Sequence, residues 1–486
     1  MHPPELLTPP RRPLPPGRRL LLISHHFPPG QATGALRWQK LASHAAERGW
    51  GIDAITVHPD SLASADFTRL AELPEGTRVY GVRVPPDRWA RWEDAAHAFL
   101  RRVVRRSASP GRSGSSGGSA SPAHPAPADA DLAWRRDLRW SATPAGALRA
   151  YRAWRSFAHE WAWAKEAADA AAAVLEAGVH AAVVTCGPPH MVHLAGRQAA
   201  ARAGLPFVMD LRDPWSLAPA VTRALGSPLW YRLAERHERR AVADAALVVC
   251  NTGALADAMR AAHPAAAERV VAVMNGCDEE PLPPRREDGR FTIAYAGNIY
   301  IDRDPRPLLR AAARVAREEG LPPERFGLEF VGHADAFGGV PLVALAEAEG
   351  AGGYVTVHPR RPRAEALAML AKASVLLSLP QGVDLAIPSK VFEYMQFPAW
   401  LLALAARGSA TEVLLRGSGA DVVEPGDEEA IARVLGDRYR RWARGERPRP
   451  LNADGRFGRR RQAEVLFAEL ERIAGESAAV RRGRAA

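Results

Sequence analysis

Short apolar runs alternate with longer amphipathic stretches along most of the chain, and this rhythm limits the fold more than any other feature. The first repeat has an apolar run at 19–24, a helical pattern from Ala35 to Gly49 and a second apolar run at 51–57. Parallel strands buried on both faces form continuous apolar runs, and a helix joins each strand to the next. The rhythm resumes at 179–185. The sequence therefore predicts an α/β fold with parallel sheets.

The length of the chain allows two domains. A chain of 486 residues, 47% of them hydrophobic, can form two cores of ordinary size. We expect a first domain at 18–280, a linker at 281–290 and a second domain at 291–474. The Pro-rich start, 1–17, and the basic end, 475–486, are expected to be disordered tails.

The composition limits the kinds of binding partner and the cellular compartment that we expect for this protein. Lys and Arg exceed Asp and Glu by 65 − 54 = 11, which favours phosphates, anionic lipids or nucleic acid, although a biased genome gives the same excess. The 3 cysteines have no CxxC spacing, which argues against a disulfide framework or a zinc site. We find no signal-peptide pattern and no apolar run near the ~18 residues that span a bilayer. The expected location is cytoplasmic, with any membrane contact peripheral, at the inner face.

Residues 86–165 interrupt the rhythm, and we expect a helical and disordered insertion there. Many of the 13 Trp residues fall in this segment beside clusters of Arg, around a Ser-, Gly- and Pro-rich stretch at 107–130. Trp154, Phe157 and Trp161 share one face of a helix predicted at 151–177. Arg-rich helices with aromatic faces suit an anionic membrane surface. The alternative is that this aromatic stripe packs on the core of the first domain.

In the first half of the chain, polar residues and glycines follow the predicted strands at their carboxyl ends, where such sheets bind ligands. The loop after the first strand ends at Gly34 and is followed by Arg37, for which a surface position beside a tight turn is the alternative. This loop lacks the GxGxxG pattern, which disfavours hydride transfer. The turn at 186–190 brings His190 or His193 to the same edge, although a lone His is more often a polar helix residue.

The run 206–215, Pro-Phe-Val-Met-Asp-Leu-Arg-Asp-Pro-Trp, is more specific because an apolar strand leads directly into charged residues. Charges at the carboxyl end of a buried strand are costly unless they are paired or used. Asp213 could therefore act as a base or orient an acceptor, with Arg212 as its charge partner. The alternative is an Asp–Arg pair that only fixes the loop.

In the second half, the run 387–395, Ile-Pro-Ser-Lys-Val-Phe-Glu-Tyr-Met, follows a buried strand. A helix start with free N–H groups near Ser389 and Lys390 is a natural anion site. Glu393 shares a helix face with Lys390, so a cation for phosphate lies beside an acceptor for sugar hydroxyls. A surface Lys–Glu pair is the alternative. Gly297 at a strand end allows close backbone approach, and Arg303 is placed for a diphosphate, with Arg306 as its competitor.

The run 387–395 resembles the nucleotide-sugar signature of GT4-type glycosyltransferases, which have the GT-B fold of two facing Rossmann-like domains with a cleft between them. The Asp-Leu-Arg-Asp-Pro-Trp run is similar to one branch of that family. The resemblance covers roughly 18–57 and 179–470 but not 86–165. It implies that Glu393 holds the donor ribose and that a last amphipathic helix, expected at 456–474, crosses back to the first domain. The family's fuller pattern has two Glu separated by seven residues, and Leu385 stands at the first position here.

The resemblance implies a glycosyltransferase with a nucleoside-diphosphate-sugar donor. The second domain would bind the donor through Ser389, Lys390, Glu393, Gly297 and Arg303, with Gly34 near its phosphates. The first domain would bind a glycan, lipid-linked or small-molecule acceptor, as in polysaccharide biosynthesis, with Arg37 and Arg212 on the acceptor side. His190 or His193 could hydrogen-bond the transferred sugar. The family retains anomeric configuration and needs no obligatory metal or other cofactor.

Three other readings stay open. One is a non-catalytic GT-B partner of a glycan-assembly complex, which the missing first Glu favours. Another is a GT-B epimerase or phosphorylase-like enzyme, which would need its own acid–base pair or cofactor lysine. Binding of nucleic acid by the basic insertion is the third and predicts a steep salt dependence. We expect no specific nucleic-acid partner.

Overall fold

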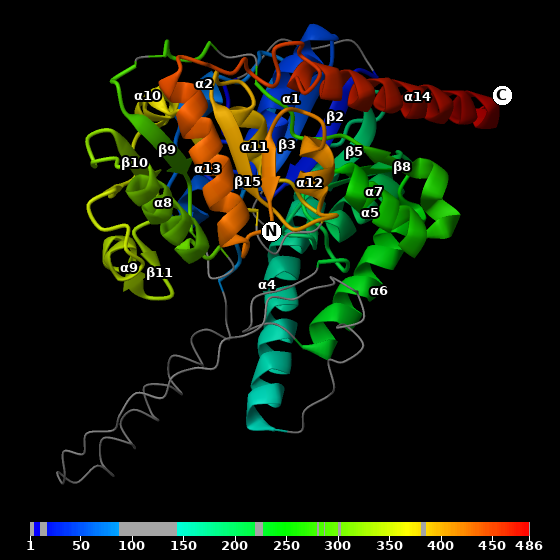
Figure 1. Ribbon diagram of the computed structural model, residues 1–486. Helices are drawn as coiled ribbons and strands as arrows, with labels where there is room; N and C mark the ends of the chain where they lie inside the picture. The colour runs from blue at the N-terminus through cyan, green and yellow to red at the C-terminus, as the bar shows by residue number, and fades with distance from the viewer. Residues whose placement is uncertain are drawn as a thin grey trace.

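The computed structural model describes residues 4–9, 17–86, 143–218, 227–278, 281–285, 287–299, 303–380 and 385–485. Two sheets form the two halves of the molecule, and the chain passes from the first to the second near residue 290 (Figure 1). Each sheet lies between layers of helices. The predicted α/β class is confirmed.

The first sheet has eight strands in the order β1-β4-β3-β2-β5-β6-β7-β8. The strands are β1 (Glu5–Leu6), β2 (Arg19–Ser24), β3 (Gly51–Val57), β4 (Thr77–Val82), β5 (His180–Gly187), β6 (Phe207–Leu211), β7 (Leu247–Cys250) and β8 (Val270–Ala272). All neighbours pair in parallel except β1 with β4. The strand order reverses between β2 and β5, and ligands bind at such a switch point in open α/β sheets.

Two hydrophobic layers enclose this sheet. One face is covered by α4 (Pro144–Val174), α5 (Val192–Ala203), α6 (Pro228–Asp244) and α7 (Gly253–Ala262). The other face is covered by α1 (Ala35–Glu47) and by α14 (Arg459–Ala485) from the end of the chain. The described connections contain the short helices η1 (Pro59–Ser61), α2 (Thr68–Ala71) and η3 (Pro264–Arg269). Both faces of the strands are therefore buried, as their continuous apolar runs predict.

The second sheet is fully parallel, in the order β13-β10-β9-β14-β15-β16. Its strands are β9 (Phe291–Ala296), β10 (Phe326–Val331), β13 (Val355–His358), β14 (Val375–Ser378), β15 (Trp400–Leu404) and β16 (Asp421–Val423). The helices are α8 (Arg306–Glu318), α9 (Leu342–Ala348), α10 (Arg363–Lys372), α11 (Ser389–Tyr394), α12 (Ala410–Leu415) and α13 (Glu428–Ala443), with a hairpin of β11 (Ala336–Phe337) and β12 (Val340–Pro341). The order reverses between β9 and β14, so this sheet repeats the switch point of the first.

The last helix, α14, crosses back and packs on the first sheet. Ala463, Leu466, Phe467 and Leu470 lie in the same buried cluster as strands β2 and β3. The crossing is fixed beside the interdomain segment, where Cys277 N–H donates to Phe457 O at 2.6 Å and Arg459 N–H donates to Cys277 O at 2.8 Å. The expected crossover of the last helix is confirmed. The expectation of a disordered tail at 475–486 is wrong up to Ala485, because the helix continues to that residue.

The start of the chain also corrects an expectation. Residues 4–9 do not form a disordered tail, because β1 pairs with β4 at the edge of the first sheet. Thr8 is 4% exposed, and its hydroxyl accepts a hydrogen bond from Val79 N–H at 3.2 Å. Pairing with an exposed strand edge orders a Pro-rich segment that has little core of its own.

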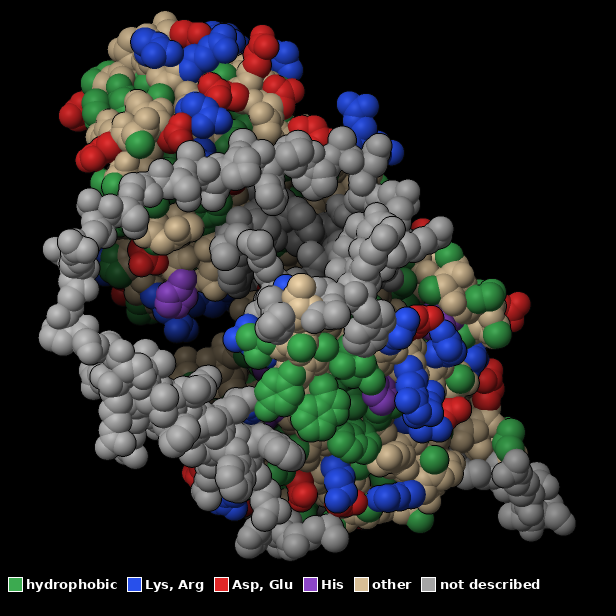
Figure 2. Space-filling view, turned by 90° about the horizontal axis from the view of Figure 1, so that it is seen from below, with side chains coloured by type: hydrophobic (Ala, Val, Ile, Leu, Met, Phe, Trp, Pro, Cys, Tyr) green, Lys and Arg blue, Asp and Glu red, His purple; other side chains and the backbone are tan. Residues whose placement is uncertain are grey.

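The insertion is described only in part, and its predicted features at 87–142 lie outside the described residues. Helix α4 begins at Pro144, before the predicted start, and its second half is core: Phe157 and Trp163 are 7% and 2% exposed. Of the predicted aromatic stripe, Phe157 lies in the buried cluster and Trp161 packs against it, so packing on the domain core is confirmed for Phe157 and Trp161. Leu148, Tyr151 and Trp154 are exposed, and hydrophobic side chains gather beside Lys and Arg on the face shown in Figure 2. A membrane role for 86–165 stays a prediction.

Within the described ranges, every helix is too short or too polar to cross a lipid bilayer.

Candidate functional site

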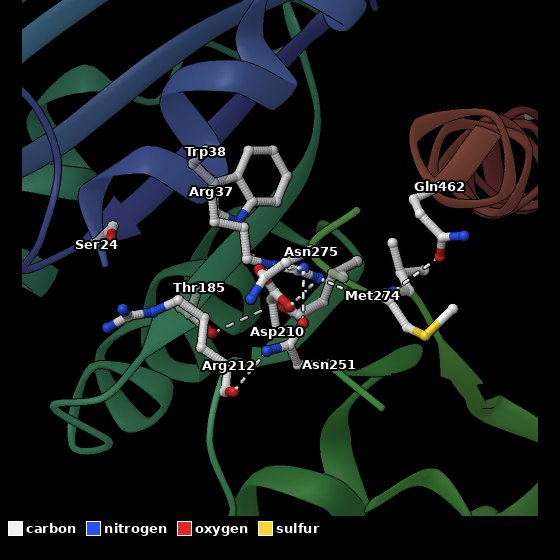
Figure 3. A network of polar contacts seen from close by, with 12 residues as sticks. Ser24, Arg37, Trp38, Thr185, Asp210, Arg212, Asn251, Met274, Asn275 and Gln462 are labelled. Atoms are coloured by element: carbon white, nitrogen blue, oxygen red, sulfur yellow. Dashed lines mark hydrogen bonds and ion pairs between the residues drawn. The ribbon is translucent and has the colours of Figure 1, made fainter. Parts of the chain in front are cut away.

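A fully bonded arginine lies beneath the carboxyl edge of the first sheet. Arg37 of α1 forms a two-pronged pair with Asp210 at the end of β6, with Nε–Oδ2 at 2.9 Å and Nη2–Oδ1 at 3.0 Å. Its remaining N–H groups donate to Asn251, Asn275 and the Val273 carbonyl at 2.9–3.4 Å. Trp38 Nε1–H also donates to Asp210, at 2.7 Å. Figure 3 shows this network, whose members come from four separate segments.

This network corrects the position expected for Arg37. The side chain is 3% exposed, so neither a surface position nor a place against an acceptor describes it. An arginine has five N–H donors, and all five are used inside the protein. The partner Asp210 raises the pKa of Arg37 against the opposing effect of burial. Arg37 therefore links α1 to β6 and to the segment that follows β8 through its hydrogen bonds.

Arg212 emerges two residues after Asp210 and has the opposite environment. Its backbone is fixed, because Arg212 N–H donates to Gly187 O at 3.0 Å and Asn251 Nδ2–H donates to Arg212 O at 3.0 Å. Its side chain extends away from the Arg37 network (Figure 3). Nη2 donates to Pro188 O, while the buried Nε has no hydrogen-bond partner among the described residues. The network thus holds the backbone of an arginine whose side chain is left largely unpaired.

The absence of a side chain at Gly34, in the first loop, leaves space for the guanidinium of this arginine. A Cβ atom at Gly34 would lie 1.7 Å from Nη1 of Arg212. Any larger residue would force the guanidinium to move. The structure therefore brings together Gly34 and Arg212, which are 178 positions apart and for which the sequence analysis predicts separate roles.

His190 and His193 are buried beside the same edge. The His190 ring stacks on Trp215 with centroids 5.2 Å apart, and its Nδ1 has no partner among the described residues. His193 Nδ1 lies 2.8 Å from the Thr185 hydroxyl, and the ring is 0% exposed. Burial lowers the pKa of both, that of His193 to about 3. His190 is 9% exposed and His193 is 0% exposed, so His190 has the better access to a ligand.

The sequence analysis did not predict two further histidines at this edge of the sheet. His25 and His26 follow β2, with their rings in edge contact at 4.9 Å, and His25 also contacts Trp163 of α4 at 4.9 Å. Burial is the main cause that lowers the pKa of His25 to about 3 and of His26 to about 4, and Arg212 contributes to both. Their position directly after the first strand could have indicated that they lie at the ligand-binding edge of the sheet. At neutral pH these rings are uncharged hydrogen-bonding groups.

Glu160 of α4 is another missed residue. Its carboxylate accepts a hydrogen bond from Met191 N–H at 3.4 Å, directly before α5. Burial raises the pKa of Glu160 to about 7, while the backbone N–H groups of Met191 and His190 oppose the rise. An acidic residue on the apolar stripe of the predicted helix was the signal that could have identified it. Glu160 ties α4 to the turn that carries His190.

Asp213 and Glu238 are carboxylates in contrasting settings. Glu238 is 0% exposed and accepts hydrogen bonds from Ser216 N–H at 2.9 Å and from the Ser216 hydroxyl at 2.6 Å. Asp213 has an exposed surface, and among the described residues it has no hydrogen-bond or ion-pair partner. Desolvation by the surrounding protein raises the pKa of Asp213, and the positive charges of Arg212 and Arg37 oppose the rise. The predicted Arg212–Asp213 pair is not formed at hydrogen-bond distance.

In the second domain, Lys390 is the central cation. Its ammonium lies 4.0 Å from the centroid of the Tyr295 ring, and Nζ has no hydrogen-bond partner among the described residues. A Cβ at Gly297 would lie 2.4 Å from Nζ, and Gly297 has φ +139°, so the strand end must be glycine here. Burial is the main cause that lowers the pKa of Lys390 to about 7, with Arg303 adding to the shift and Glu393 opposing it.

Neighbouring groups fix this lysine at the switch point of the second sheet. The fully buried Tyr394 anchors α11, because its hydroxyl accepts from Ala296 N–H at 2.9 Å. Arg303 donates from Nη1 to Asn298 O at 3.1 Å and to the Tyr295 hydroxyl at 3.3 Å. Ser389 is exposed at the start of α11. The competitor, Arg306, pairs instead with Asp304.

Glu393 has a partner that the sequence did not predict. Its Oε1 lies 2.7 Å from Nη1 of Arg363, the first residue of α10, so the expected Lys390–Glu393 surface pair is replaced by an Arg363–Glu393 pair. The Glu393 side chain is 23% exposed and can still be reached from solvent. The spacing of 30 residues between the two partners hid this pair from helix-periodicity arguments.

Leu385 joins the two domains. Its side chain packs against the buried cluster of the first sheet, and its carbonyl accepts a hydrogen bond from the Thr252 hydroxyl at 2.6 Å. Thr252 also caps α7 by accepting from Leu255 N–H at 2.9 Å. The position where the resembling family has its first Glu is therefore used here for contact with the first domain.

No protein-family model and no curated protein matches the sequence. Solved structures match it over nearly its whole length. Sucrose-phosphate synthase from Thermosynechococcus elongatus has a TM-score of 0.56 at 14% identity, with 96% of this chain and 98% of that chain covered. The α,α-trehalose 6-phosphate synthase from Burkholderia multivorans has a TM-score of 0.54, with the same identity and coverage. A UDP-forming trehalose-phosphate synthase from Burkholderia xenovorans has 0.52 at 13% identity, with 94% and 99% covered.

The fold is GT-B. In a GT-B fold the carboxyl edges of the two sheets face one cleft. The structure gathers Gly34, His190, Arg212 and Asp213 at the first edge and Gly297, Arg303, Lys390 and Glu393 at the second. Among the described residues, no group of three His, Cys, Asp or Glu side chains is arranged to hold a metal ion.

Proposed function

We propose that this protein is a glycosyltransferase that moves a sugar from a nucleoside-diphosphate-sugar donor to an acceptor bound by the first domain. The observation that carries the proposal is the ammonium group of Lys390, which is buried without a hydrogen-bond partner among the described residues. Leaving a buried cation unpaired costs free energy, which an anionic ligand would recover. The absence of a side chain at Gly297 leaves room for that ammonium group at the end of the strand.

The proposed donor site follows from these neighbours. Lys390 and Arg303 would contact the diphosphate, and their charge would stabilise it as it becomes the leaving group. Glu393 would accept hydrogen bonds from the ribose hydroxyls, with Arg363 holding its carboxylate in place. Ser389 lies at the start of the same helix. One of the proteins with a similar fold is named as UDP-forming, which supports a nucleoside-diphosphate product.

The proposed acceptor site lies on the first domain. Asp213 has a raised pKa and no hydrogen-bond partner among the described residues, so it is the candidate base or orienting group for an acceptor hydroxyl. His190 would contact the transferred sugar from the rim, and His193 would support it. A glycan, lipid-linked or small-molecule acceptor fits this proposal. Retention of configuration and membership of the GT4 branch remain predictions from the resemblance.

Thermal unfolding with a panel of nucleoside diphosphates and nucleotide sugars tests the proposal. A ligand that binds only the folded state raises the melting temperature. We expect one diphosphate to do so in the wild type and to lose most of the effect in Lys390→Ala and Glu393→Ala. Lys372→Ala, which removes an exposed lysine at the end of α10, is the matched control and should keep the full shift. No shift with any ligand in the folded wild type would contradict the proposal.

A non-catalytic GT-B partner protein is the second candidate. The observation in its favour is Leu385, which contacts the first domain where the resembling family has an acidic sugar ligand. Such a protein could bind a nucleotide without turning over a sugar nucleotide. Slow hydrolysis of the donor by the wild type, abolished in Lys390→Ala, would rule this candidate out.

A further inference from the structure

Arg212 is a second cation at the site without a compensating carboxylate. Among the described residues it forms no ion pair, its Nε has no acceptor, and only Nη2 bonds, to the Pro188 carbonyl. Asp210, two residues earlier, is fully engaged by Arg37 and Trp38. Asp213 lies near enough for Arg212 to lower its pKa but does not pair with it. A partly buried guanidinium in this state favours an anionic ligand.

The groups around Arg212 do not neutralise it. Imidazoles from two loops lie within its electrostatic reach: His25 and His26 after β2, and His190 and His193 after β5. All four are neutral at pH 7, so they add neither positive charge nor a counter-ion. His190 is 9% exposed, and its buried Nδ1 has no hydrogen-bond partner among the described residues.

Several contacts of the scaffold hold Arg212 in its position. Gly187 and Asn251 hold its backbone from two strands, and Asn251 is itself held by Arg37. The absence of a side chain at Gly34 makes room for the guanidinium. A surface arginine that only adds solubility needs none of these constraints. Arg212 is partly exposed, so a ligand can reach it.

From this arrangement we infer that the first domain contains an anion subsite, centred on Arg212, that binds a phosphate group. The inference rests on the proposed function and deepens it by naming the acceptor class: a hydroxyl compound that carries a phosphate. The planar fork of arginine can donate two hydrogen bonds to one phosphate. The same chemistry could come from the donor's diphosphate, and the experiment below separates the two sources.

The test is isothermal titration of the full chain with inorganic phosphate, with and without a saturating nucleoside diphosphate. We expect phosphate to bind in both conditions, and Arg212→Gln to weaken it roughly 10-fold or more. Arg212→Lys, which keeps the charge but loses the fork, should give an intermediate loss. Arg202→Gln removes an exposed arginine of the same domain and should bind phosphate like the wild type.

The outcomes separate this inference from the proposed function. If phosphate and the nucleoside diphosphate compete, and Arg212→Gln weakens both, the subsite exists but holds the donor's diphosphate. If the diphosphate binds through Lys390 while phosphate binding is absent or unchanged in Arg212→Gln, the inference is overturned and the proposed function stands. If phosphate binds through Arg212 and no diphosphate binds, the subsite stands and the proposed donor site fails. Unliganded melting curves verify that each variant is folded.

Discussion

Arg37 and Arg212 lie at the same edge of the first sheet, and the comparison between them separates scaffold from site. Arg37 uses all five donors on protein acceptors and is 3% exposed. Arg212 is partly exposed, and its side chain is bonded only to one carbonyl among the described residues. Both are held by Asn251, one through its side chain and the other through its backbone. Arg37, which is fully paired, therefore helps to position Arg212, whose side chain is not.

The second domain shows the same difference with a lysine. Lys390, like Arg212, lies against a glycine backbone and has an unpartnered nitrogen among the described residues. In the same domain, Arg438 of α13 is paired with Asp421 of β16. Among the described residues, a cationic side chain with an unpartnered nitrogen therefore lies at the carboxyl edge of each sheet. This comparison leads to testable differences in stability and in binding.

The largest expected effect is on the paired arginine. Arg37→Met leaves the Asp210 carboxylate buried without its partner, and we expect the free energy of unfolding to fall by about 3–5 kcal/mol. Arg212→Gln should change it by less than about 1 kcal/mol, because the residue is partly exposed and weakly bonded. Urea denaturation of both variants measures the difference. Equal losses in the two variants would show that the comparison between scaffold and site is wrong.

A smaller effect separates the two carboxylates. Glu238→Ala leaves Ser216 N–H buried without an acceptor, and we expect a loss of roughly 1–3 kcal/mol in unfolding free energy. Asp213→Asn should leave stability nearly unchanged, because among the described residues Asp213 has no hydrogen-bond partner. If Asp213 acts on the acceptor, the same substitution should abolish transfer once an acceptor is known. A stability loss in Asp213→Asn as large as that in Glu238→Ala would assign Asp213 to the scaffold.

The smallest effect is expected at the contact between the domains. Thr252→Val removes both the cap of α7 and the bond to Leu385 O, and we expect a loss of about 1 kcal/mol. Thr252→Ser keeps the hydroxyl and is the matched control. The loop that carries Leu385 leads to Lys390, so Thr252→Val should also weaken diphosphate binding a few-fold. Unchanged binding would show that this contact does not influence the donor site.

Much of the fold could be predicted from the sequence, because continuous apolar runs indicate buried parallel strands. The order of strands in the two sheets repeats one topology, and the return of α14 to the first sheet was expected. The errors lie at the ends of the chain. The edge strand β1 depends on pairing with β4, and the last part of α14 continues a helix beyond its apolar face. Neither signal is contained in local periodicity.

The candidate site was harder to predict because its geometry depends on distant partners. The sequence indicated which loops end at the edges, and those loops carry Arg212, Gly297 and Lys390. It could not indicate that Arg37 turns inward to Asp210, since that pair spans 173 positions. It also missed Arg363 as the partner of Glu393. Residue type and position at a strand end predict where a site lies. Which of these side chains can contact a ligand depends on the ion pairs and hydrogen bonds that they form with distant residues.

The central claim is that Lys390 is the cation of a diphosphate site, and proton uptake on binding tests it most directly. With a pKa of about 7, Lys390 is mostly neutral at pH 8 in the free protein. A bound diphosphate, already ionised at that pH, should raise this pKa and draw in about 0.9 of a proton per ligand. Calorimetry at pH 8 in two buffers of different ionisation enthalpy measures this uptake. The account predicts nearly one proton for the wild type and none for Lys390→Gln; the same uptake in both proteins, or none in either, would contradict it.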